Sequence, residues 1–480
     1  MSDIEARLEE LERLGLARRL RLISGPQGPT VLLEGKPVLL LCSNNYLGLA
    51  DHPRVREAAA EAAMRWGVGA GASRLVSGTM TIHGRLEERL AAFKGSEACV
   101  LFGSGYLANL GVIGALAGRG DTIFSDELNH ASIVDASRLS RAEVIVYRHR
   151  DVEHLEWNLR RHGRDAQARR LIVTDSVFSM DGDVAPLETL TELAQEYAAQ
   201  IVVDEAHALG NLGPGGRGAV AEAGLDGEID VVVGTLGKAL GSYGAYACAS
   251  AETVRYLINS ARSLIYSTAP PPPAVAGALA ALELLREEPQ RVQRLRSNAR
   301  ALRAALSAEG FPVTESEMQI VPLIVGEERA AMRLCQQAIE RGVFAQAIRP
   351  PTVPDGTARL RLTAMASHTA AELRAAAEVL GRIARSLELD LSAMAPPHSE
   401  RPAPALEQDD YAELPVEAQA PFDAEHGDTA EAILVRARRP RAPSRAELDE
   451  REGREPVPAG EQAAAPFDFE RELEADARAA

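Results

Sequence analysis

The chain has 480 residues, of which 46% are hydrophobic, and this is enough apolar material for a large core and an ordinary two-domain enzyme. Its formal net charge of −17 argues against a nucleic-acid-binding surface, because phosphate backbones reward clustered lysines and arginines. The sequence contains no run of about 18 apolar residues and no secretory leader, so we expect no membrane segment and a cytoplasmic location.

The pattern of the first two thirds of the chain predicts an α/β fold. Leucines at roughly helical spacing between Ser2 and Arg21 predict an amphipathic helix, within an N-terminal helical segment over residues 1–45. Short apolar runs that alternate with helical stretches then predict a large domain over 46–268, with a largely parallel sheet covered on both faces. The expected strands are 98–102, 144–147, 171–174, 201–203 and 231–233.

A smaller α+β domain is predicted over residues 269–390, because the prolines at 270–273 break the alternating pattern. It begins with a long helical signal over 274–308, which is interrupted near Pro289. The expected elements that follow are an apolar strand over 320–325, an extended segment over 348–354, a strand over 359–363 and a helix that ends near Leu387.

The last part of the chain has a different composition, rich in Pro, Ala, Glu and Arg. From Glu400 onward it has 21 acidic residues against 10 arginines and no lysine. Such a segment cannot bury enough apolar surface to offset its ordering entropy, so residues 391–480 are predicted to form a disordered acidic tail. Ala-Pro-Phe-Asp occurs twice, at 420–423 and 465–468, which indicates either a docking motif or chance recurrence.

The four cysteines are scattered singly, without a second cysteine or a histidine at metal-ligand spacing. They are Cys42, Cys99, Cys248 and Cys335. We therefore expect reduced thiols in the core and no metal site.

Lys238 is a candidate nucleophile, because it lies just past an apolar strand and between Gly237 and Gly241. A partly desolvated ammonium at such a place favours its neutral, nucleophilic form. A lone lysine is more often an ordinary surface residue, so this prediction depends on other segments.

Asp204 ends another apolar strand, and His207 follows it three positions later. A pyridoxal ring needs an anion at its nitrogen in order to accept electrons from a carbanion, and Asp204 is placed to supply that anion. His207 could then bind the phenolic oxygen of the ring. The same string, Asp-Glu-Ala-His, is typical of helicases and ATPases, but residues 234–239 fail the spacing and the final hydroxyl of a phosphate loop.

A glycine turn at residues 103–105 connects the strand over 98–102 to a helix. The free amides at a helix start bind anions, which suits a cofactor phosphate, although a purely structural turn is equally common. The glycines at 67–71 lack a preceding strand, so a dinucleotide site is not expected there.

Taken in order, these segments resemble the α-oxoamine synthase family of fold-type I pyridoxal-phosphate enzymes, from about Leu11 to Leu387. The resemblance lies in residues 42–49 (CSNNYLGL), 126–132 (DELNHAS) and 176–183 (SVFSMDGD), together with the segments around Asp204 and Lys238. It implies the large and small domains predicted above, with pyridoxal 5'-phosphate (PLP) as the cofactor.

The resemblance also implies a role for each matched residue at the cofactor. His130 would stack on the ring, and Ser179 would touch the oxygen region of the ring. The phosphate would lie at Gly105, Tyr106 and Thr235. The alternatives are a core histidine for His130 and a turn cap for Ser179.

For the substrates, the resemblance implies that Arg361 holds the carboxylate of an amino acid, a task that suits the planar guanidinium. The prolines before Thr352 would form a stiff wall for the acyl chain, and Arg18 would help to bind the polar end of that chain. Arg19 and Arg21 are equally plausible by position. The family is homodimeric, so Thr268 would reach the phosphate in the partner subunit.

The reaction implied is the decarboxylative condensation of an amino acid with an acyl thioester, with Lys238, His130 and Asp204 as catalytic residues. The strings most resemble the branch that joins L-alanine to a pimeloyl thioester in biotin synthesis, on coenzyme A or on a carrier protein. The alternatives are the branch that ligates glycine with acetyl-CoA, the serine palmitoyltransferases, and a non-catalytic interaction protein that acts through its tail.

Overall fold

A seven-stranded sheet occupies the middle of the chain, where the sequence predicts alternating strands and helices. In the computed structural model, which describes residues 3–162, 168–314 and 316–394, its strands lie in the order β4-β10-β9-β8-β7-β5-β6. Neighbouring strands are parallel except in the two pairs that β10 makes. The predicted α/β fold with a largely parallel sheet is therefore confirmed. The bounds are β4 Ala98–Phe102, β5 Thr122–Asp126, β6 Glu143–Tyr147, β7 Arg170–Asp175, β8 Gln200–Asp204, β9 Val231–Thr235 and β10 Ala245–Ala249.

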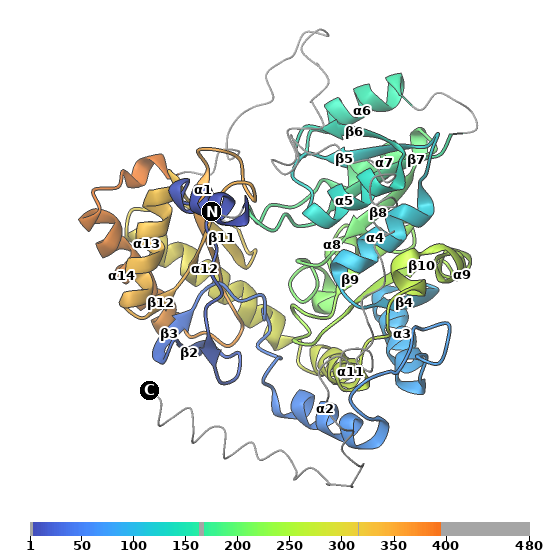
Figure 1. Cartoon of the computed structure of the whole chain (residues 1–480), viewed down its shortest axis with the longest axis horizontal. Coiled ribbons are helices and arrows are strands. Elements are labelled where there is room, and N and C mark those ends of the chain that lie inside the picture. The colour runs from blue at the N-terminus through green and yellow to red at the C-terminus, as the bar shows by residue number, and fades with distance from the viewer. Residues whose placement is uncertain (1–2, 163–167, 315, 395–480) are drawn as a thin grey trace, which may run out of the picture. The chain divides into compact units, whose positions relative to one another are not determined.

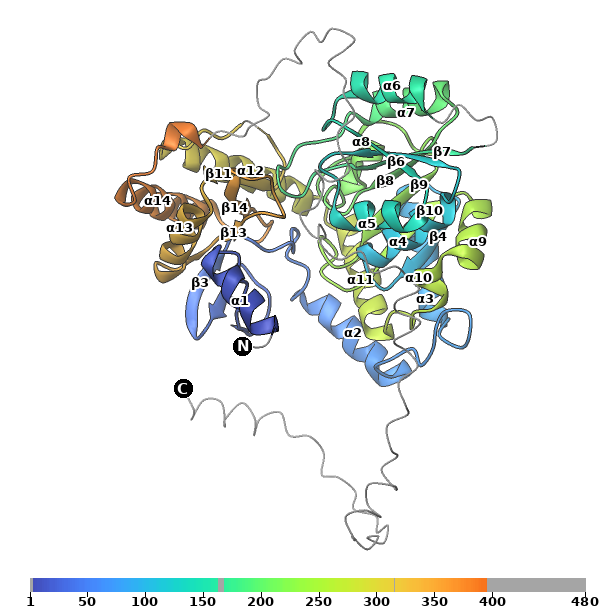
Figure 2. The same ribbon diagram turned by 45° about the horizontal axis from the view of Figure 1, so that its top comes forward.

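Helices cover both faces of this sheet (Figure 1 and Figure 2), and each face has its own cluster of buried side chains. Because water is excluded on both sides, the central strands are apolar along most of their length. One face is covered by α4 (Gly105–Leu116), α5 (Ala131–Ser140), α9 (Ala251–Ser260) and α10 (Arg262–Ile265). The other is covered by α2 (Pro53–Trp66), α3 (Thr81–Lys94), α6 (Val152–Arg161), α7 (Leu187–Glu196), α8 (Ala219–Glu222) and α11 (Pro272–Glu287).

A smaller, antiparallel sheet has the order β11-β14-β13. Its bounds are β11 Ile320–Gly326, β13 Gln346–Ile348 and β14 Ala358–Thr363, and α12 (Gln290–Ala308), α13 (Glu328–Glu340) and α14 (Ala370–Ser386) share a separate core with it. The predicted break near Pro289 is present, since α11 ends at Glu287 and α12 begins at Gln290. The buried side chains of α11 belong to the core of the large sheet. The limits of the two predicted domains stay a prediction.

The first 45 residues are mostly not helical, which corrects the predicted N-terminal helical segment. Helix α1 covers only Asp3–Arg13, because Gly15 has a φ of 69° and the amide of Leu16 donates back to the carbonyl oxygen of Leu11. The strands β1 (Ile23–Ser24), β2 (Thr30–Leu33) and β3 (Lys36–Leu40) follow, and β3 pairs in parallel with β12 (Val343–Phe344). β2 and β3 form a hairpin whose two turn residues both have positive φ.

The tail predicted over 391–480 lies outside the described residues, except for 391–394. Within the described ranges, no helix is long and apolar enough to cross a membrane.

A buried ion pair lies next to the end of the central strand β8. Lys94, the last residue of α3, donates to the carboxylate of Glu205 and to the carbonyl oxygen of Arg217. The other carboxylate oxygen of Glu205 accepts the amide of Val220 at 2.7 Å. Both charged side chains are almost fully buried. Glu205 follows Asp204, so the pair fixes the backbone directly beside a candidate catalytic carboxylate.

Removing one partner of this pair should destabilise the fold strongly. Lys94→Met is expected to lower the free energy of unfolding by about 3–5 kcal/mol, because Glu205 would stay buried without a compensating charge. The double variant Lys94→Met/Glu205→Leu should recover most of the loss, since no unpaired charge remains. Urea unfolding followed by circular dichroism measures both. Arg382→Met, at an exposed position, is the control. A double variant no more stable than Lys94→Met would contradict this account.

Candidate active site

Three of the predicted site residues lie where parallel strands of the large sheet end. Asp204 is the last residue of β8, His207 follows in the next turn, and Lys238 lies three residues after β9. The carboxyl ends of neighbouring parallel strands meet at one edge of a sheet, so the loops that follow them converge. The Nζ atom of Lys238 lies 2.9 Å from Nε2 of His207.

Asp204 is buried and is held from two sides. One carboxylate oxygen accepts a hydrogen bond from the side-chain amide of Asn109 at 2.7 Å, and the other accepts the backbone amide of Ala206 at 2.8 Å. Asn109 lies on α4 and also donates to the hydroxyl of Ser132 at 2.9 Å. A carboxylate fixed in this way could pair with the protonated nitrogen of a pyridoxal ring.

A second buried carboxyl group, that of Asp175 at the end of β7, lies beside Asp204 and was not predicted as a site residue. Burial raises the pKa of Asp175 well above its usual value, and the charge of Asp204 raises it further. Asp175 accepts the backbone amide of His130 at 2.7 Å, so it fixes the loop that carries His130. The sequence contained a signal for it, because Asp175 also ends an apolar strand.

The turn between β4 and α4 could hold an anion. The hydroxyl of Ser104 accepts the amide of Leu107 at 3.2 Å, and the amides of Gly105 and Tyr106 have no partner within the helix. A Cβ added to Gly105 would meet no atom within 4 Å, so the space beside this residue is open. The positive end of the helix dipole favours a phosphate there. The hydroxyl of Tyr106 donates to the carboxylate of Asp135 on α5.

The other residues predicted at the cofactor have different surroundings. His130 is exposed at the start of α5. The hydroxyl of Thr235 accepts the amide of Gly237 at 3.2 Å. Thr268 is exposed and forms an isolated β-bridge with Ser73. Their contacts to the ring and the phosphate stay predictions.

Arg361, on β14 of the small sheet, reaches this centre. Its side chain is buried, and its Nε donates to the carbonyl oxygen of Ser179. Its two terminal nitrogens donate to Asn44 Oδ1 at 3.2 Å and to Tyr46 Oη at 3.4 Å. Its charge also contributes to the lowered pKa of Lys238. A guanidinium fixed so close to an amine could hold the carboxylate of an amino acid.

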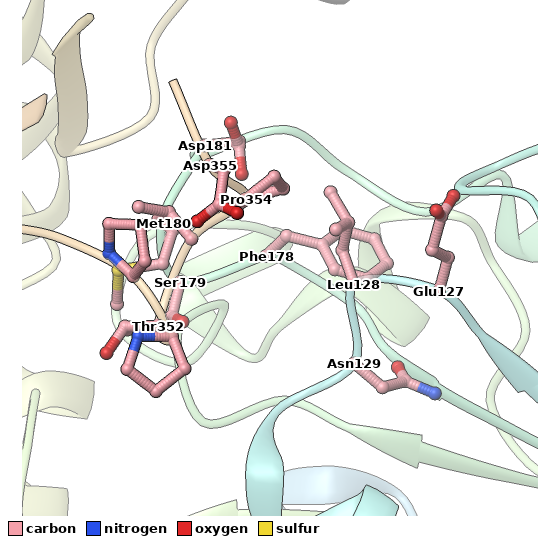
Figure 3. A pocket seen from close by; sticks show the side chains of 13 residues that line it. Glu127, Leu128, Asn129, Phe178, Ser179, Met180, Asp181, Thr352, Pro354 and Asp355 are labelled. Atoms are coloured by element: carbon pink, nitrogen blue, oxygen red, sulfur yellow. The ribbon is translucent and has the colours of Figure 1, made fainter. Parts of the chain in front are cut away.

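A cavity of about 330 Å³ lies beside Ser179. Figure 3 shows Thr352 and Pro354 close to Ser179 and Met180, and all four residues line this cavity. The predicted proline wall therefore lines a space next to the residue that Arg361 contacts. Arg18 lines a second cavity, of about 770 Å³, and Thr352 lines both cavities.

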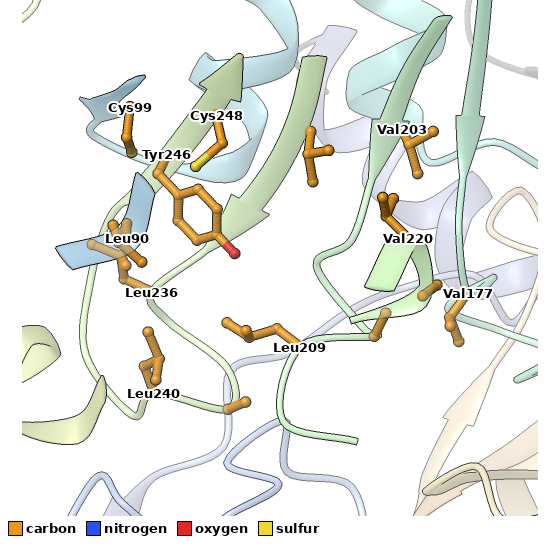
Figure 4. Close-up of a cluster of buried hydrophobic side chains, with 14 of the residues drawn as sticks. Leu90, Cys99, Val177, Val203, Leu209, Val220, Leu236, Leu240, Tyr246 and Cys248 are labelled. Carbon is orange, nitrogen blue, oxygen red and sulfur yellow. The ribbon is translucent and has the colours of Figure 1, made fainter. Parts of the chain in front are cut away.

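Lys238 lies between core residues. Leu236 and Leu240 are fully buried in the same core cluster as Tyr246, as Figure 4 shows. Burial lowers the pKa of Lys238 to about 8, although nearby carboxylates oppose the shift. The neutral fraction of the amine near neutral pH is therefore much larger than that of an ordinary lysine, which suits a nucleophile or general base.

Lys238 begins a chain of hydrogen bonds that the sequence analysis did not predict. The other ring nitrogen of His207, Nδ1, lies 2.6 Å from Tyr46 Oη, which in turn lies 3.0 Å from Asn44 Oδ1. Burial lowers the pKa of His207 and raises that of Tyr46, so both side chains are neutral. When Lys238 donates to Nε2, the ring proton is on Nδ1 and is donated to Tyr46, whose hydroxyl donates to Asn44.

His149 connects two loops at the edge of the site. Its Nδ1 lies 2.9 Å from a carboxylate oxygen of Asp126, and its Nε2 lies 2.8 Å from one of Asp183. The ring packs edge-on against Phe178, with 4.3 Å between the ring centroids. Burial lowers the pKa of His149, but the hydrogen bonds to the two carboxylates outweigh it and raise the pKa to about 10. The imidazolium therefore joins the end of β5 to the loop that carries Ser179.

Comparison with known proteins agrees with this geometry. A family model described as aminotransferase class I and II matches residues 36–380. The chain is 52% identical to an 8-amino-7-oxononanoate synthase of Citrifermentans bemidjiense, over 81% of this chain and 99% of that protein. It is 53% identical to one of Geobacter sulfurreducens, over 80% and 98%. One similar solved structure is a serine palmitoyltransferase from S. paucimobilis with bound PLP, which is 33% identical with a TM-score of 0.76, over 81% of this chain and 98% of that chain. Another is an 8-amino-7-oxononanoate synthase from Francisella tularensis, which is 27% identical with a TM-score of 0.63, over 73% of this chain and 99% of that chain.

The contribution of His149 to stability should depend on pH. Its pKa rises from 6.5 to about 10 on folding, so the contribution is fully present below about pH 6.5 and is lost as the pH rises through 10. His149→Gln should therefore lower the free energy of unfolding by about 1–3 kcal/mol at pH 6, and by much less at pH 10. Urea unfolding of both proteins at pH 6, 8 and 10 measures the difference. An equal loss at all three pH values would show that the imidazole carries no charge.

Proposed function

The chain belongs to the aminotransferase class I and II family, and from its 52% identity to an 8-amino-7-oxononanoate synthase we propose that it joins L-alanine to a pimeloyl thioester, in the pathway to biotin. The products are 8-amino-7-oxononanoate, carbon dioxide and a free thiol. The observation that carries the proposal is the convergence of a half-buried amine, a buried carboxylate and a fixed guanidinium, those of Lys238, Asp204 and Arg361.

The residues at this centre fit pyridoxal phosphate. Asp204 would pair with the ring nitrogen, the amine of Lys238 would hold the aldehyde, and the start of α4 at Gly105 would take the phosphate, where the space is open. His130 would contact the face of the ring, and His207 would contact its phenolic oxygen. When bound, the cofactor supplies an electron sink for the negative charge that develops on the α-carbon of the amino acid.

The side chains of the protein would then bind the amino acid and move its proton. Arg361 holds the carboxylate beside Lys238, whose neutral amine removes the proton from the α-carbon and later returns one. A hydrogen bond to His207 fixes Lys238, and a hydrogen bond to Tyr46 fixes His207 in turn. Overall, one carbon–carbon bond forms to the acyl carbon while its carbon–sulfur bond breaks. The bond between the α-carbon and its carboxyl group breaks next, and a proton takes its place.

A homodimer is part of the proposal. Several large apolar residues stay exposed near the start of α4 or in the loops before α3 and α11, which supports a protein interface there. They include Tyr106, Tyr266 and Val76, with 41%, 72% and 79% of their surfaces exposed. Thr268, next to Tyr266, would act at the phosphate in the partner subunit.

A serine palmitoyltransferase activity is the second candidate, because one such enzyme matches the fold with a TM-score of 0.76. Its acyl tunnel would have to be apolar throughout. Polar groups from Thr352, Asp355 and Asn129 line the cavity beside Ser179, which favours the shorter acyl group with a polar end.

Lys238→Ala should abolish both turnover and the covalent attachment of the cofactor, because no other lysine among the described residues lies at this centre. Asp204→Ala should lower kcat by orders of magnitude more than it weakens cofactor binding, since its charge matters most as the carbanion forms. Borohydride reduction followed by mass spectrometry locates the attachment, and visible absorbance measures the bound cofactor. Attachment that persists in Lys238→Ala would contradict the assignment.

L-Alanine with pimeloyl-CoA should have a specificity constant about a hundredfold above those of glycine with acetyl-CoA and of serine with palmitoyl-CoA. The acyl cavity with its proline wall would favour the medium-length donor. Rates of thiol release with the three pairs give the ratio. A preference for either other pair would assign the chain to a sister activity and leave the roles of Lys238 and Asp204 standing.

A further inference from the structure

Tyr46 lies between two groups that the proposed reaction uses. Its hydroxyl oxygen lies 2.6 Å from Nδ1 of His207 and 3.0 Å from Oδ1 of Asn44, and it accepts a hydrogen bond from Nη2 of Arg361 at 3.4 Å. The side chain is fully buried, and the backbone carbonyl oxygen of Tyr46 accepts the amide of Ala366 at 2.7 Å. The hydroxyl is therefore held at one position, in contact with these three side chains.

The three contacts of this hydroxyl restrict the direction of its proton. A tyrosine hydroxyl has one proton to donate and lone pairs that accept. Arg361 can only donate, whereas Oδ1 of Asn44 can only accept, and it already accepts Nη1 of Arg361 at 3.2 Å. The proton of Tyr46 therefore points either to Asn44 or to Nδ1 of His207, and neither direction leaves Asn44 without a donor.

The proton on His207 decides between these two directions. Burial lowers the pKa of His207, so the imidazole is neutral and one of its two nitrogens carries the proton. The charged or titratable groups that face it act in the same direction, and they are Lys238, Arg361 and His130. When Lys238 donates to Nε2 over 2.9 Å, the ring proton is on Nδ1 and is donated to Tyr46. When Nε2 donates instead, Nδ1 needs a donor, and the hydroxyl of Tyr46 lies at the right distance.

On the basis of the proposed function, we propose that Tyr46 is a positioning residue whose hydroxyl reverses its hydrogen bond with His207 when the cofactor binds. A free ammonium group on Lys238 can only donate to Nε2, so Tyr46 then accepts from Nδ1. The ionised phenolic oxygen of pyridoxal phosphate can only accept, so Nε2 must then carry the proton and Tyr46 donates to Nδ1. Arg361 completes both arrangements, because it donates to Asn44 and to Tyr46 in each.

The position of the ring proton can be measured directly by nitrogen NMR of protein with labelled histidines, since protonated and unprotonated ring nitrogens have different chemical shifts. Comparison with His207→Gln identifies the signals of His207. At about pH 7 we expect the proton on Nδ1 in the protein freed of cofactor and on Nε2 in the holoenzyme. The same position in both forms would overturn the proposal.

Tyr46→Phe tests the hydroxyl itself, through the visible absorbance of the bound cofactor. Without a donor at Nδ1, His207 gives a weaker hydrogen bond to the phenolic oxygen, so the pH midpoint of the absorbance change should rise by about one unit. Tyr246→Phe is the matched control, because Tyr246 is also fully buried, but its hydroxyl has no hydrogen-bond partner within the described residues.

A second variant keeps the test decisive if Tyr46→Phe does not fold. Site-specific 3-fluorotyrosine at position 46 preserves the packing and is a stronger donor, so it should move the midpoint in the opposite direction. A midpoint that stays unchanged in the folded variants would overturn the proposal.

Kinetics separates this role from a general loss of structure. Tyr46→Phe should lower kcat for L-alanine with pimeloyl-CoA about tenfold and change KM for L-alanine less than twofold, because Arg361 keeps its other contacts. An equal loss in Tyr246→Phe would assign the effect to packing and overturn the role of the hydroxyl. The NMR and absorbance measurements need no substrate. A protein that gives both expected results but turns over no pimeloyl donor would therefore contradict the proposed function and leave the role of Tyr46 standing.

Discussion

The free-energy cost of burying the ammonium of Lys238 is the constraint on which the site depends. A cation in apolar surroundings loses its hydration, so the group gives up its proton more readily, and its pKa falls to about 8. Leu236 and Leu240, two positions before and after Lys238, are part of the core under the large sheet. The carboxylates of Asp204 and Asp175 limit the shift. The same burial therefore stabilises the fold and keeps the amine reactive.

Much of the large sheet could be predicted because its strands are rich in valine, isoleucine and leucine. β5 was missed, since Ile123 and Phe124 are the only apolar residues in its sequence, Thr-Ile-Phe-Ser-Asp. β10 was also missed, since its sequence, Ala-Tyr-Ala-Cys-Ala, has low intrinsic strand propensity. Its alanines belong to the core on one face of the sheet, and Tyr246 and Cys248 belong to the core on the other. Burial on both faces thus decides its conformation. The N-terminal helix was predicted too long because leucine spacing outweighed the helix-ending signal of Gly15.

The site was predictable to the extent that its residues end strands or begin helices. Lys238, Asp204 and His207 met that condition, and the structure brings Lys238 and His207 within hydrogen-bonding distance. Tyr46 and Arg361 are 315 positions apart, and no local pattern reports that their side chains meet. Asn109 is likewise a polar residue on a helix, and nothing in the sequence around it indicates that its side chain contacts Asp204. The contact of Tyr46 with Arg361 depends on where the small sheet places β14, and that of Asn109 with Asp204 depends on the packing of α4 on the large sheet.

The parallel pairing of β3 with β12 has a consequence for synthesis on the ribosome. β3 is made early, and its edge stays unpaired until residues 343–344 have emerged. The next contacts wait longer, since Leu41 accepts the amide of Thr363 and Tyr46 accepts that of Ala366, each at 2.7 Å. An unpaired strand edge readily adds a strand from another chain. A nascent chain therefore carries an N-terminal hairpin with one unpaired strand edge for most of its translation.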